Sequence, residues 1–179
     1  NGLLRVAWDA DGLLTSVFDK SAQREVLAEG ALGNLLQLHE DHPAHWDAWD
    51  VDESYLDKVV DLVDAESVEV VTDDPLRGEV AVVRRFGGSA GEGPSTIRQV
   101  LRLDAGSRRL EVHNEVDWRE RHRFLKAAFP VAIRSSRATY EIQHGTIERP
   151  TVRNTSWDAA QFEVSAHRWA HLGETGYGV

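Results

Sequence analysis

Short runs rich in Val, Ile, Leu, Phe and Thr recur along the whole chain, and turn residues separate them. Residues 3–8 and 13–18 flank the turn Asp9-Ala10-Asp11-Gly12, whose glycine allows the positive φ that a tight hairpin needs. Residues 66–72 pair in the same way with 78–86, and residues 96–103 pair with 109–116. Because such a series is typical of antiparallel sheets, the sequence predicts an all-β fold with three hairpins.

The remaining segments give weaker patterns. Residues 124–133 and 138–142 are expected to continue the meander, residues 161–164 and 168–172 are weaker strand candidates, and only 55–63 has helical spacing. The glycine-rich stretch 87–94 is interpreted as a flexible hairpin loop. In the third hairpin, one polar residue falls on each predicted inner face: Ile97, Gln99, Leu101 and Leu103 on one strand, and Leu110, Val112, Asn114 and Val116 on the other.

Length and charge limit the function classes. A chain of 179 residues predicts one domain over residues 1–179, and both ends resemble cuts from a larger multidomain protein. The net charge of -10 argues against nucleic acid or an anionic membrane as partner. Without cysteine there is no thiolate nucleophile and no disulfide framework. No stretch reaches the length of a membrane span or a signal peptide, so we expect a soluble, cytoplasmic protein.

The densest cluster of polar and aromatic side chains is residues 39–52, with three His, five acids and two Trp in fourteen residues. Stacking of a sugar on Trp46 and Trp49, with Asp47 and Asp50 accepting hydroxyl hydrogen bonds, is one interpretation. A zinc site from His39, His42 and His45 with Asp47 or Asp50 is another, although Pro43 prevents the helix that would align them. The plainest alternative is that both Trp side chains pack this loop onto the sheet. Asp47 and Asp50 could also be the acid and the nucleophile of a glycosidase, but any acidic loop could supply the required spacing, so the pattern supports this only weakly.

A second polar segment covers residues 148–158 and continues to 166–169. Trp157, Asp158 and His167 are predicted to line the same cleft as the first cluster, whereas the plain alternative puts Trp157 and Trp169 in the core. Ser156 with His144 or His167 lacks the Gly-x-Ser-x-Gly context of a nucleophile and is set aside. Residues 117–122 are interpreted as a salt-bridged turn that Trp118 anchors.

Several motifs together resemble the β-sandwich domain of glycoside hydrolase family 38 α-mannosidases, in the order of the cytosolic-type bacterial branch. They are NGLLRV (1–6), DGLLTSVFDK (11–20), REVL (24–27), GNLLQL (33–38), WDAWD (46–50), FLKAAFP (124–130), ATYEIQHG (138–145), RPT (149–151) and NTSWD (154–158).

This resemblance implies a galactose-mutarotase-like supersandwich, with the possibility of truncation at the C-terminal end. It also implies a parent enzyme that hydrolyses α-mannosidic bonds with retention. The nucleophile and zinc of that family lie in an α/β domain followed by a helical bundle, so no catalytic or metal residue is assigned in this chain. The expected partners are those domains of the parent, a mannose-containing carbohydrate and a second copy through an unpaired strand edge.

Two other functions stay open. The chain could be a carbohydrate-binding module that uses Trp46 and Trp49 as a platform. It could also be a mutarotase-like epimerase with a His and a Glu as acid and base.

Overall fold

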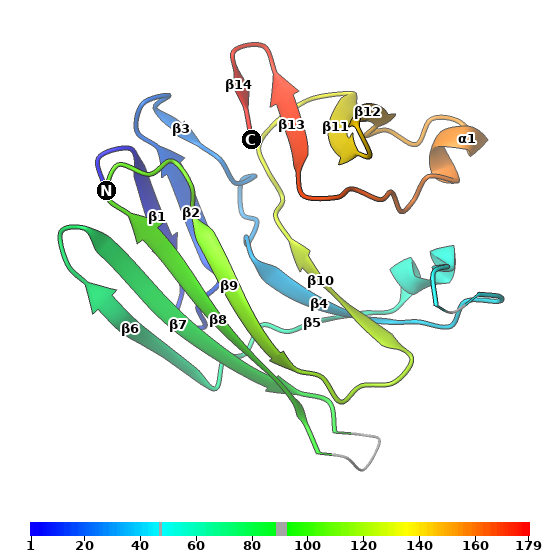
Figure 1. Cartoon of the computed structure of the whole chain (residues 1–179), viewed down its shortest axis with the longest axis horizontal. Coiled ribbons are helices and arrows are strands. Elements are labelled where there is room, and N and C mark those ends of the chain that lie inside the picture. The colour runs from blue at the N-terminus through cyan, green and yellow to red at the C-terminus, as the bar shows by residue number, and fades with distance from the viewer. Residues whose placement is uncertain (47, 89–92) are drawn as a thin grey trace. The chain divides into compact units, whose positions relative to one another are not determined.

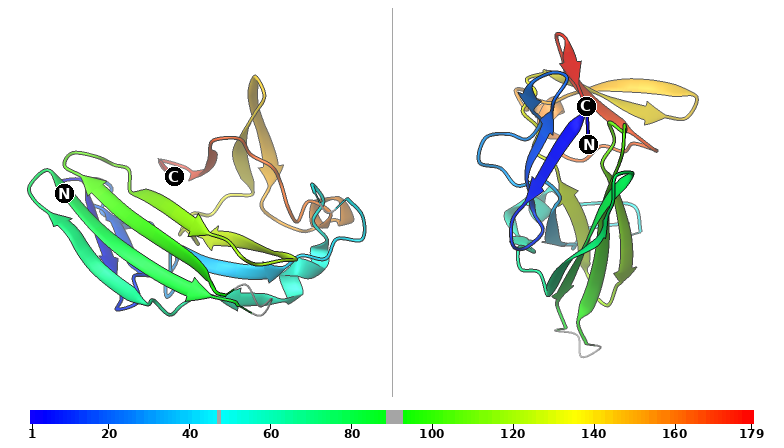
Figure 2. Two further views of the ribbon diagram at one scale, coloured as in Figure 1. Left: turned by 60° about the horizontal axis from the view of Figure 1, so that its bottom comes forward. Right: turned by 90° about the vertical axis from the view of Figure 1, so that its left-hand side faces the viewer.

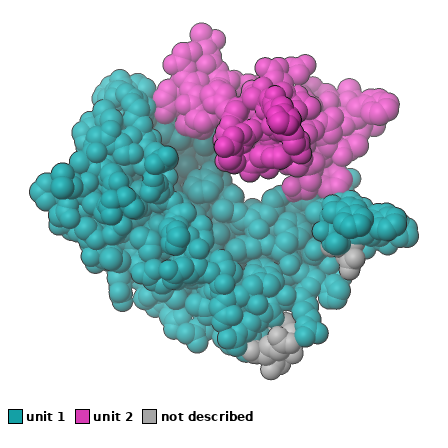
Figure 3. All heavy atoms as spheres, in the orientation of Figure 1, with its two compact units in different colours: residues 1–131 teal, residues 132–179 magenta. Residues whose placement is uncertain are grey.

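The computed structural model describes residues 1–46, 48–88 and 93–179. The chain divides into two compact units, Asn1–Val131 and Ala132–Val179, which Figure 3 colours separately. In the described ranges every sheet draws its strands from one unit only. The expectation of a single domain over residues 1–179 stays a prediction.

The larger unit contains a four-stranded sheet with the order β6-β7-β8-β9. Figures 1 and 2 show its green strands running side by side; they are β6 (Ser67–Asp73), β7 (Arg77–Phe86), β8 (Ser95–Asp104) and β9 (Glu111–Asp117). All three pairings are antiparallel, with Val80 opposite Leu101 and Leu101 opposite Val112. The second and third predicted hairpins are therefore confirmed. Of the 87–94 loop, residues 89–92 lie outside the described residues.

A second layer of the larger unit consists of two three-stranded sheets, ordered β1-β2-β3 and β10-β4-β5. Their strands are β1 (Leu4–Trp8), β2 (Leu14–Asp19), β3 (Arg24–Glu25), β4 (Leu35–Glu40), β5 (Val59–Asp61) and β10 (Arg123–Ala128). Two isolated bridges, Leu14 with Gly33 and Leu27 with Val131, connect the segments around them. The first predicted hairpin is confirmed, since Val6 lies opposite Val17.

The two layers enclose the core. Leu14 and Leu27 of one layer pack with Val80, Val82 and Leu101 of the other. A second cluster joins Leu36, Leu38 and Leu62 to Ile97. Each fully buried aliphatic side chain contributes about 1.5–3 kcal/mol of transfer free energy. This packing of sheet on sheet confirms the predicted antiparallel β-sandwich.

The smaller unit has one four-stranded antiparallel sheet with the order β12-β11-β13-β14. Its elements are β11 (Arg137–Ile142), β12 (Gly145–Pro150), a four-residue helix α1 (Ser156–Ala159), β13 (Ala170–Glu174) and β14 (Tyr177–Gly178). Thr139 lies opposite Glu148 on one side and opposite His171 on the other. These three residues therefore stand in one row across the sheet.

Several local predictions are wrong. β10 does not continue the meander after β9 but pairs with β4 in the other layer, because the turn at 117–122 carries the chain across the sandwich. The helical spacing of 55–63 produces only a short 3-10 helix, η1 (Glu53–Asp57), before β5 begins. Residues 161–164 form no strand, and much of the predicted irregular segment 148–158 belongs to β12 and α1.

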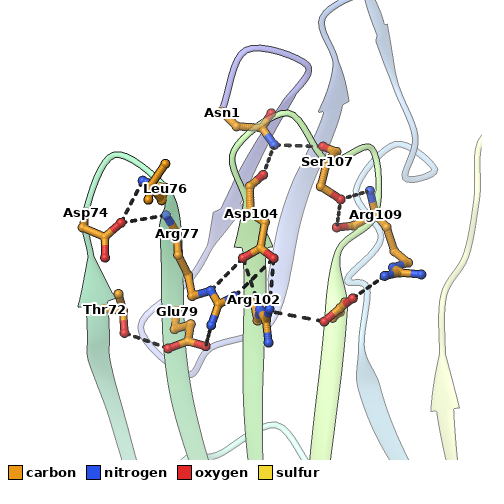
Figure 4. A network of polar contacts seen from close by, with 11 residues as sticks. Asn1, Thr72, Asp74, Leu76, Arg77, Glu79, Arg102, Asp104, Ser107 and Arg109 are labelled. Carbon is orange, nitrogen blue, oxygen red and sulfur yellow. Dashed lines mark hydrogen bonds and ion pairs between the residues drawn. The ribbon is translucent and has the colours of Figure 1, made fainter.

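A network of ion pairs closes one end of the β6–β9 sheet (Figure 4). The Asp104 carboxylate accepts hydrogen bonds from Arg77 Nε at 2.7 Å and Arg102 Nη2 at 3.0 Å. Asn1 Nδ2 donates to the backbone carbonyls of Asp104 and Ser107, which ties the start of the chain to the β8–β9 turn. The two guanidinium groups hold the pKa of Asp104 well below its ordinary value.

Within the described ranges, no helix has the length and apolar character required to cross a membrane.

Candidate functional site

Two indole rings face solvent where the backbone of Trp49 and Asp50 returns to Trp46; this segment is called the 46–50 turn, and its residue 47 lies outside the described residues. The Trp46 carbonyl accepts hydrogen bonds from the backbone N–H groups of Trp49 and Asp50, both at 2.9 Å. This turn places the rings of Trp46 and Trp49 with centroids 5.8 Å apart and planes 12° from parallel. The two residues remain 66% and 78% exposed. The alternative that they pack the loop onto the sheet is therefore wrong.

Trp46 has an unusual backbone for a large residue, with φ at +59°. Left-handed backbone is unfavourable for a residue with a Cβ and is found most often at turns and functional sites. Asp50 is exposed, and its carboxylate accepts from the Val51 N–H at 3.0 Å. Asp47, the other predicted carboxylate of this site, lies outside the described residues.

The carboxylates beside this turn have local structural partners. Asp52 caps η1 by accepting from the Ser54 N–H at 3.0 Å, and hydrogen bonds from Ser54 lower the pKa of Asp52. Lys58 Nζ donates to Glu40 at 2.8 Å, which lowers the pKa of that carboxyl. The Lys58–Glu40 ion pair therefore joins residues 40 and 58, and Asp52 fixes the start of η1.

The three histidines of the zinc interpretation are not brought together among the described residues. Leu36 and Leu38 face the core, so His39 points to the opposite face of β4. There the imidazole stacks on the Phe124 ring, with the two ring centroids 5.2 Å apart. The rings of His39 and Tyr55 form an edge-to-face pair with centroids 5.0 Å apart. His42 instead stacks on His122 at 5.3 Å. Among the described residues, no three His, Asp or Glu side chains are placed to hold a metal ion.

The second predicted group of residues belongs to the smaller unit. Trp157 is 83% exposed on α1, and Trp169 is 43% exposed, so the core interpretation of both is wrong. Asp158 forms a capping box with Thr155, whose hydroxyl oxygen accepts from the Asp158 N–H at 3.1 Å. His167 is exposed, and its backbone N–H donates to the backbone carbonyl of Glu141 at 3.1 Å. Since these residues and Trp46, Trp49 and Asp50 lie in different units, their shared cleft stays a prediction.

Two pockets lie away from the predicted site residues. One, of about 440 Å³, lies in the larger unit between β1 and the β6–β7 turn, and exposed Trp8, Val70 and Leu76 are among its lining residues. The other, of about 500 Å³, lies on the sheet of the smaller unit and has Thr139, Glu148 and His171 in its wall. Sequence analysis missed this second pocket because it depends on the register of β11, β12 and β13. Only the alternation of Arg137, Thr139 and Glu141 could have indicated one polar face.

Comparison with known proteins shows which family the chain resembles. The family model described as the glycosyl hydrolases family 38 C-terminal domain matches residues 1–179. The human protein named alpha-mannosidase 2C1 is 45% identical over all of this chain, which covers 17% of the human protein. Alpha-mannosidase G of Dictyostelium discoideum is 37% identical, and an alpha-mannosidase of Saccharomyces cerevisiae is 32% identical, again over the whole chain.

The chain thus spans about a sixth of the length of the curated relatives that it matches. The match covers every element of both units. The chain belongs to the C-terminal domain family of glycosyl hydrolases family 38.

Proposed function

We propose that this chain is a non-catalytic domain of a retaining, zinc-dependent α-mannosidase that hydrolyses terminal α-mannosidic linkages. The observation that carries the proposal is the match of the whole chain to proteins named alpha-mannosidases that are about six times longer. Their additional length is room for the α/β domain and the helical bundle that would contain the nucleophile and the zinc. No residue of this chain is proposed as the nucleophile or as a zinc ligand.

The role proposed for this domain is to support and wall the active-site cleft. The turn at 46–50 is the part of the chain best suited to that role, because it presents two large apolar ring faces beside the exposed carboxylate of Asp50. The apolar face of a pyranose stacks on indole, and a carboxylate accepts hydrogen bonds from neighbouring hydroxyls. Trp157, Asp158 and His167 are proposed as further residues of the wall.

The test of the cleft-wall role uses the full-length protein that contains this chain. Trp46→Ala with Trp49→Ala removes binding area without touching a reacting group, so we expect KM for an α-mannoside to rise roughly tenfold with kcat nearly unchanged. Leu76→Ala, which removes an equally exposed apolar side chain from the β6–β7 turn, is the control. Unchanged KM in the double variant would remove the turn from the cleft.

The test of the non-catalytic assignment uses the 179-residue chain by itself. We expect no hydrolysis of an aryl α-mannoside, with or without added zinc, while the full-length protein is active. Zinc-dependent hydrolysis by the 179-residue chain would show that the catalytic groups lie within it and would overturn the proposal.

A second candidate function is sugar binding by the isolated domain, which the exposed Trp46–Trp49 pair favours. A titration with mannobiose, followed by Trp fluorescence, separates the two. Saturable quenching that Trp49→Ala abolishes supports a binding module, whereas no response supports a domain that acts only within the longer protein.

We also propose that the longer protein is cytoplasmic and forms a homo-oligomer. Cell fractionation tests the location, and light scattering of the purified protein tests the assembly.

A further inference from the structure

The pocket of the smaller unit is a site for which neither the family nor the cleft-wall role gives a function. Glu148, Thr139 and His171 come from β12, β11 and β13, and the register places them directly opposite one another. Adjacent strands are about 4.8 Å apart, so the row spans about 10 Å between its outer Cα atoms. All three residues border the pocket of about 500 Å³, which is within the usual size of a small-molecule site.

The imidazole of His171 lies against two glycines that leave it room. Gly173 and Gly178 are opposite one another on β13 and β14. A Cβ atom built on Gly173 would come within 2.7 Å of His171 Nε2, and one built on Gly178 would come within 2.5 Å of His171 Cε1. Any other residue at these positions would push the ring away. The two glycines therefore leave the space in which the imidazole lies over the sheet at the pocket.

The charges around the pocket select the kind of ligand. Arg137 Nη1 lies 3.8 Å from Glu148 Oε2, so opposite charges stand side by side in the wall. The Glu174 carboxylate, also in the wall, accepts a hydrogen bond from the backbone N–H of Arg134 at 2.6 Å. The wall therefore carries both signs of charge, with Arg137 and Glu148 compensating each other, so an ion of either sign would meet attraction and repulsion together. A ligand recognised through hydrogen bonds needs no net charge to bind such a wall.

The hydrogen-bonding capacity narrows the class further. A carboxylate only accepts, a hydroxyl both donates and accepts, and an imidazole does one or the other at each nitrogen. A ligand that satisfies this row must carry several groups that both donate and accept, at short intervals. Hydroxyl groups on adjacent carbons have that property.

We propose that the sheet face carrying Glu148, Thr139 and His171 binds an uncharged polyhydroxylated ligand, a sugar or a closely related polyol. The site lies wholly in the smaller unit and does not depend on the cleft-wall role of Trp46 and Trp49. Glu148 accepts hydrogen bonds from ligand hydroxyl groups, and Thr139 hydrogen-bonds to the ligand at the centre of the row. The imidazole of His171, for which Gly173 and Gly178 leave room, hydrogen-bonds to the ligand at the other end.

The experiment uses the 179-residue chain with Trp46→Ala and Trp49→Ala, so that stacking at the 46–50 turn cannot contribute. Methyl α-mannoside is titrated while the backbone amide NMR signals are followed. We expect the largest shift changes at residues 139, 148 and 171, with saturation at millimolar concentration. Loss of one of the row's hydrogen bonds, by Thr139→Val or Glu148→Gln, is expected to raise Kd roughly fivefold.

Matched variants separate the site from general damage. Gly173→Ala displaces the imidazole and is expected to weaken binding as much as His171→Gln. Gly145→Ala, on β12, adds a Cβ that meets nothing within 4 Å and is expected to leave Kd unchanged. Thr146→Val changes a threonine on the same face that is not part of the pocket wall, and is likewise expected to leave Kd unchanged.

The contrary results are equally specific. Absence of shift changes at residues 139, 148 and 171, or equal weakening by Gly145→Ala and Gly173→Ala, would overturn the proposal. Neither result affects the cleft-wall role, because that role is tested by KM in the full-length protein.

Discussion

Asn34 and Gln99 exchange two side-chain amide hydrogen bonds of 3.1 and 3.2 Å, although 65 residues separate them in the chain. Both side chains are fully buried, and the bonds connect the two layers of the larger unit. The Gln99 amide also donates to Asn114 at 2.8 Å across the β8–β9 pair. A polar bridge therefore passes through the interior between the two layers, and each of its members depends on the others for hydrogen bonds.

Replacement of Gln99 by Leu is expected to destabilise the larger unit. The change keeps the volume but leaves the Asn34 amide without its partner in the core, so the free energy of unfolding should fall by about 1–3 kcal/mol. Urea unfolding measures this. Asn34 has φ at +57°, a conformation that glycine also accepts, so adding Asn34→Gly removes the unpaired amide and should restore part of the loss. A double variant that is no more stable than Gln99→Leu would contradict this account.

Arg84 and Arg85 are neighbours on β7 with opposite surroundings, and they make a matched pair of variants. Arg84 is 1% exposed, and its guanidinium donates to the carbonyls of Leu62, at 3.0 Å, and Asp11. Burial lowers the pKa of Arg84, and the nearby carboxylates of Asp11 and Asp9 oppose that effect. Arg85 is exposed and pairs with Glu66.

Arg84→Met is therefore expected to lower the free energy of unfolding by about 2–5 kcal/mol, because two carbonyls lose hydrogen bonds from a charged donor. Arg85→Met should change it by less than about 1 kcal/mol, as is usual for an exposed ion pair. Chemical denaturation of both variants compares the two directly, and similar losses would contradict the role given to Arg84.

The strands and the site differ in how far the sequence predicts them. Alternation of apolar residues specified the three hairpins and put Gln99 and Asn114 on predicted inner faces. Their pairing and the exposure of Asn114 come from the structure. The partner of β10 could not be predicted, because residues 124–128 fit either layer and only the turn at 117–122 decides between them. The exposure of Trp46 and Trp49 was also open, since an indole satisfies either a core or a sugar site. The row of Glu148, Thr139 and His171 depends on how three strands are aligned with one another. The residue pattern within one strand does not specify that alignment.

The ion pairs of Asp104 predict a pH dependence. Hydrogen bonds from Arg102 and Arg77 lower the pKa of Asp104 in the folded state below its unfolded value of about 3.9. A depressed folded pKa contributes stability that is present at neutral pH and is lost as pH falls below about 5. Asp104→Asn should therefore lower the urea midpoint at pH 7 and flatten its decline in acid. Asp73→Asn, an exposed carboxylate at the end of β6, serves as control and should keep the decline of the parent chain.

The backbone of Trp46 gives a test of whether the 46–50 turn is built for stability. Glycine is favoured at φ of +59°, and an exposed indole contributes little burial. Trp46→Gly should therefore leave the free energy of unfolding unchanged or raise it by about 1 kcal/mol, which thermal unfolding measures. Trp49→Ala should change the free energy of unfolding by less than about 0.5 kcal/mol, because this side chain is also exposed. Tyr55→Ala, which removes a ring that is 4% exposed beside His39 and Phe124, should cost about 3 kcal/mol or more.

The comparison of these three variants separates a packing role from a binding role. If the Trp variants lose as much stability as Tyr55→Ala, the indoles act as packing groups and the turn needs no ligand to explain it. If they lose none, a residue type that is unfavourable in this backbone stands at Trp46 without a folding benefit. Contact with a ligand, or with another domain of the proposed longer protein, is then the physical reason for an indole there, and the KM measurement tests the first of these.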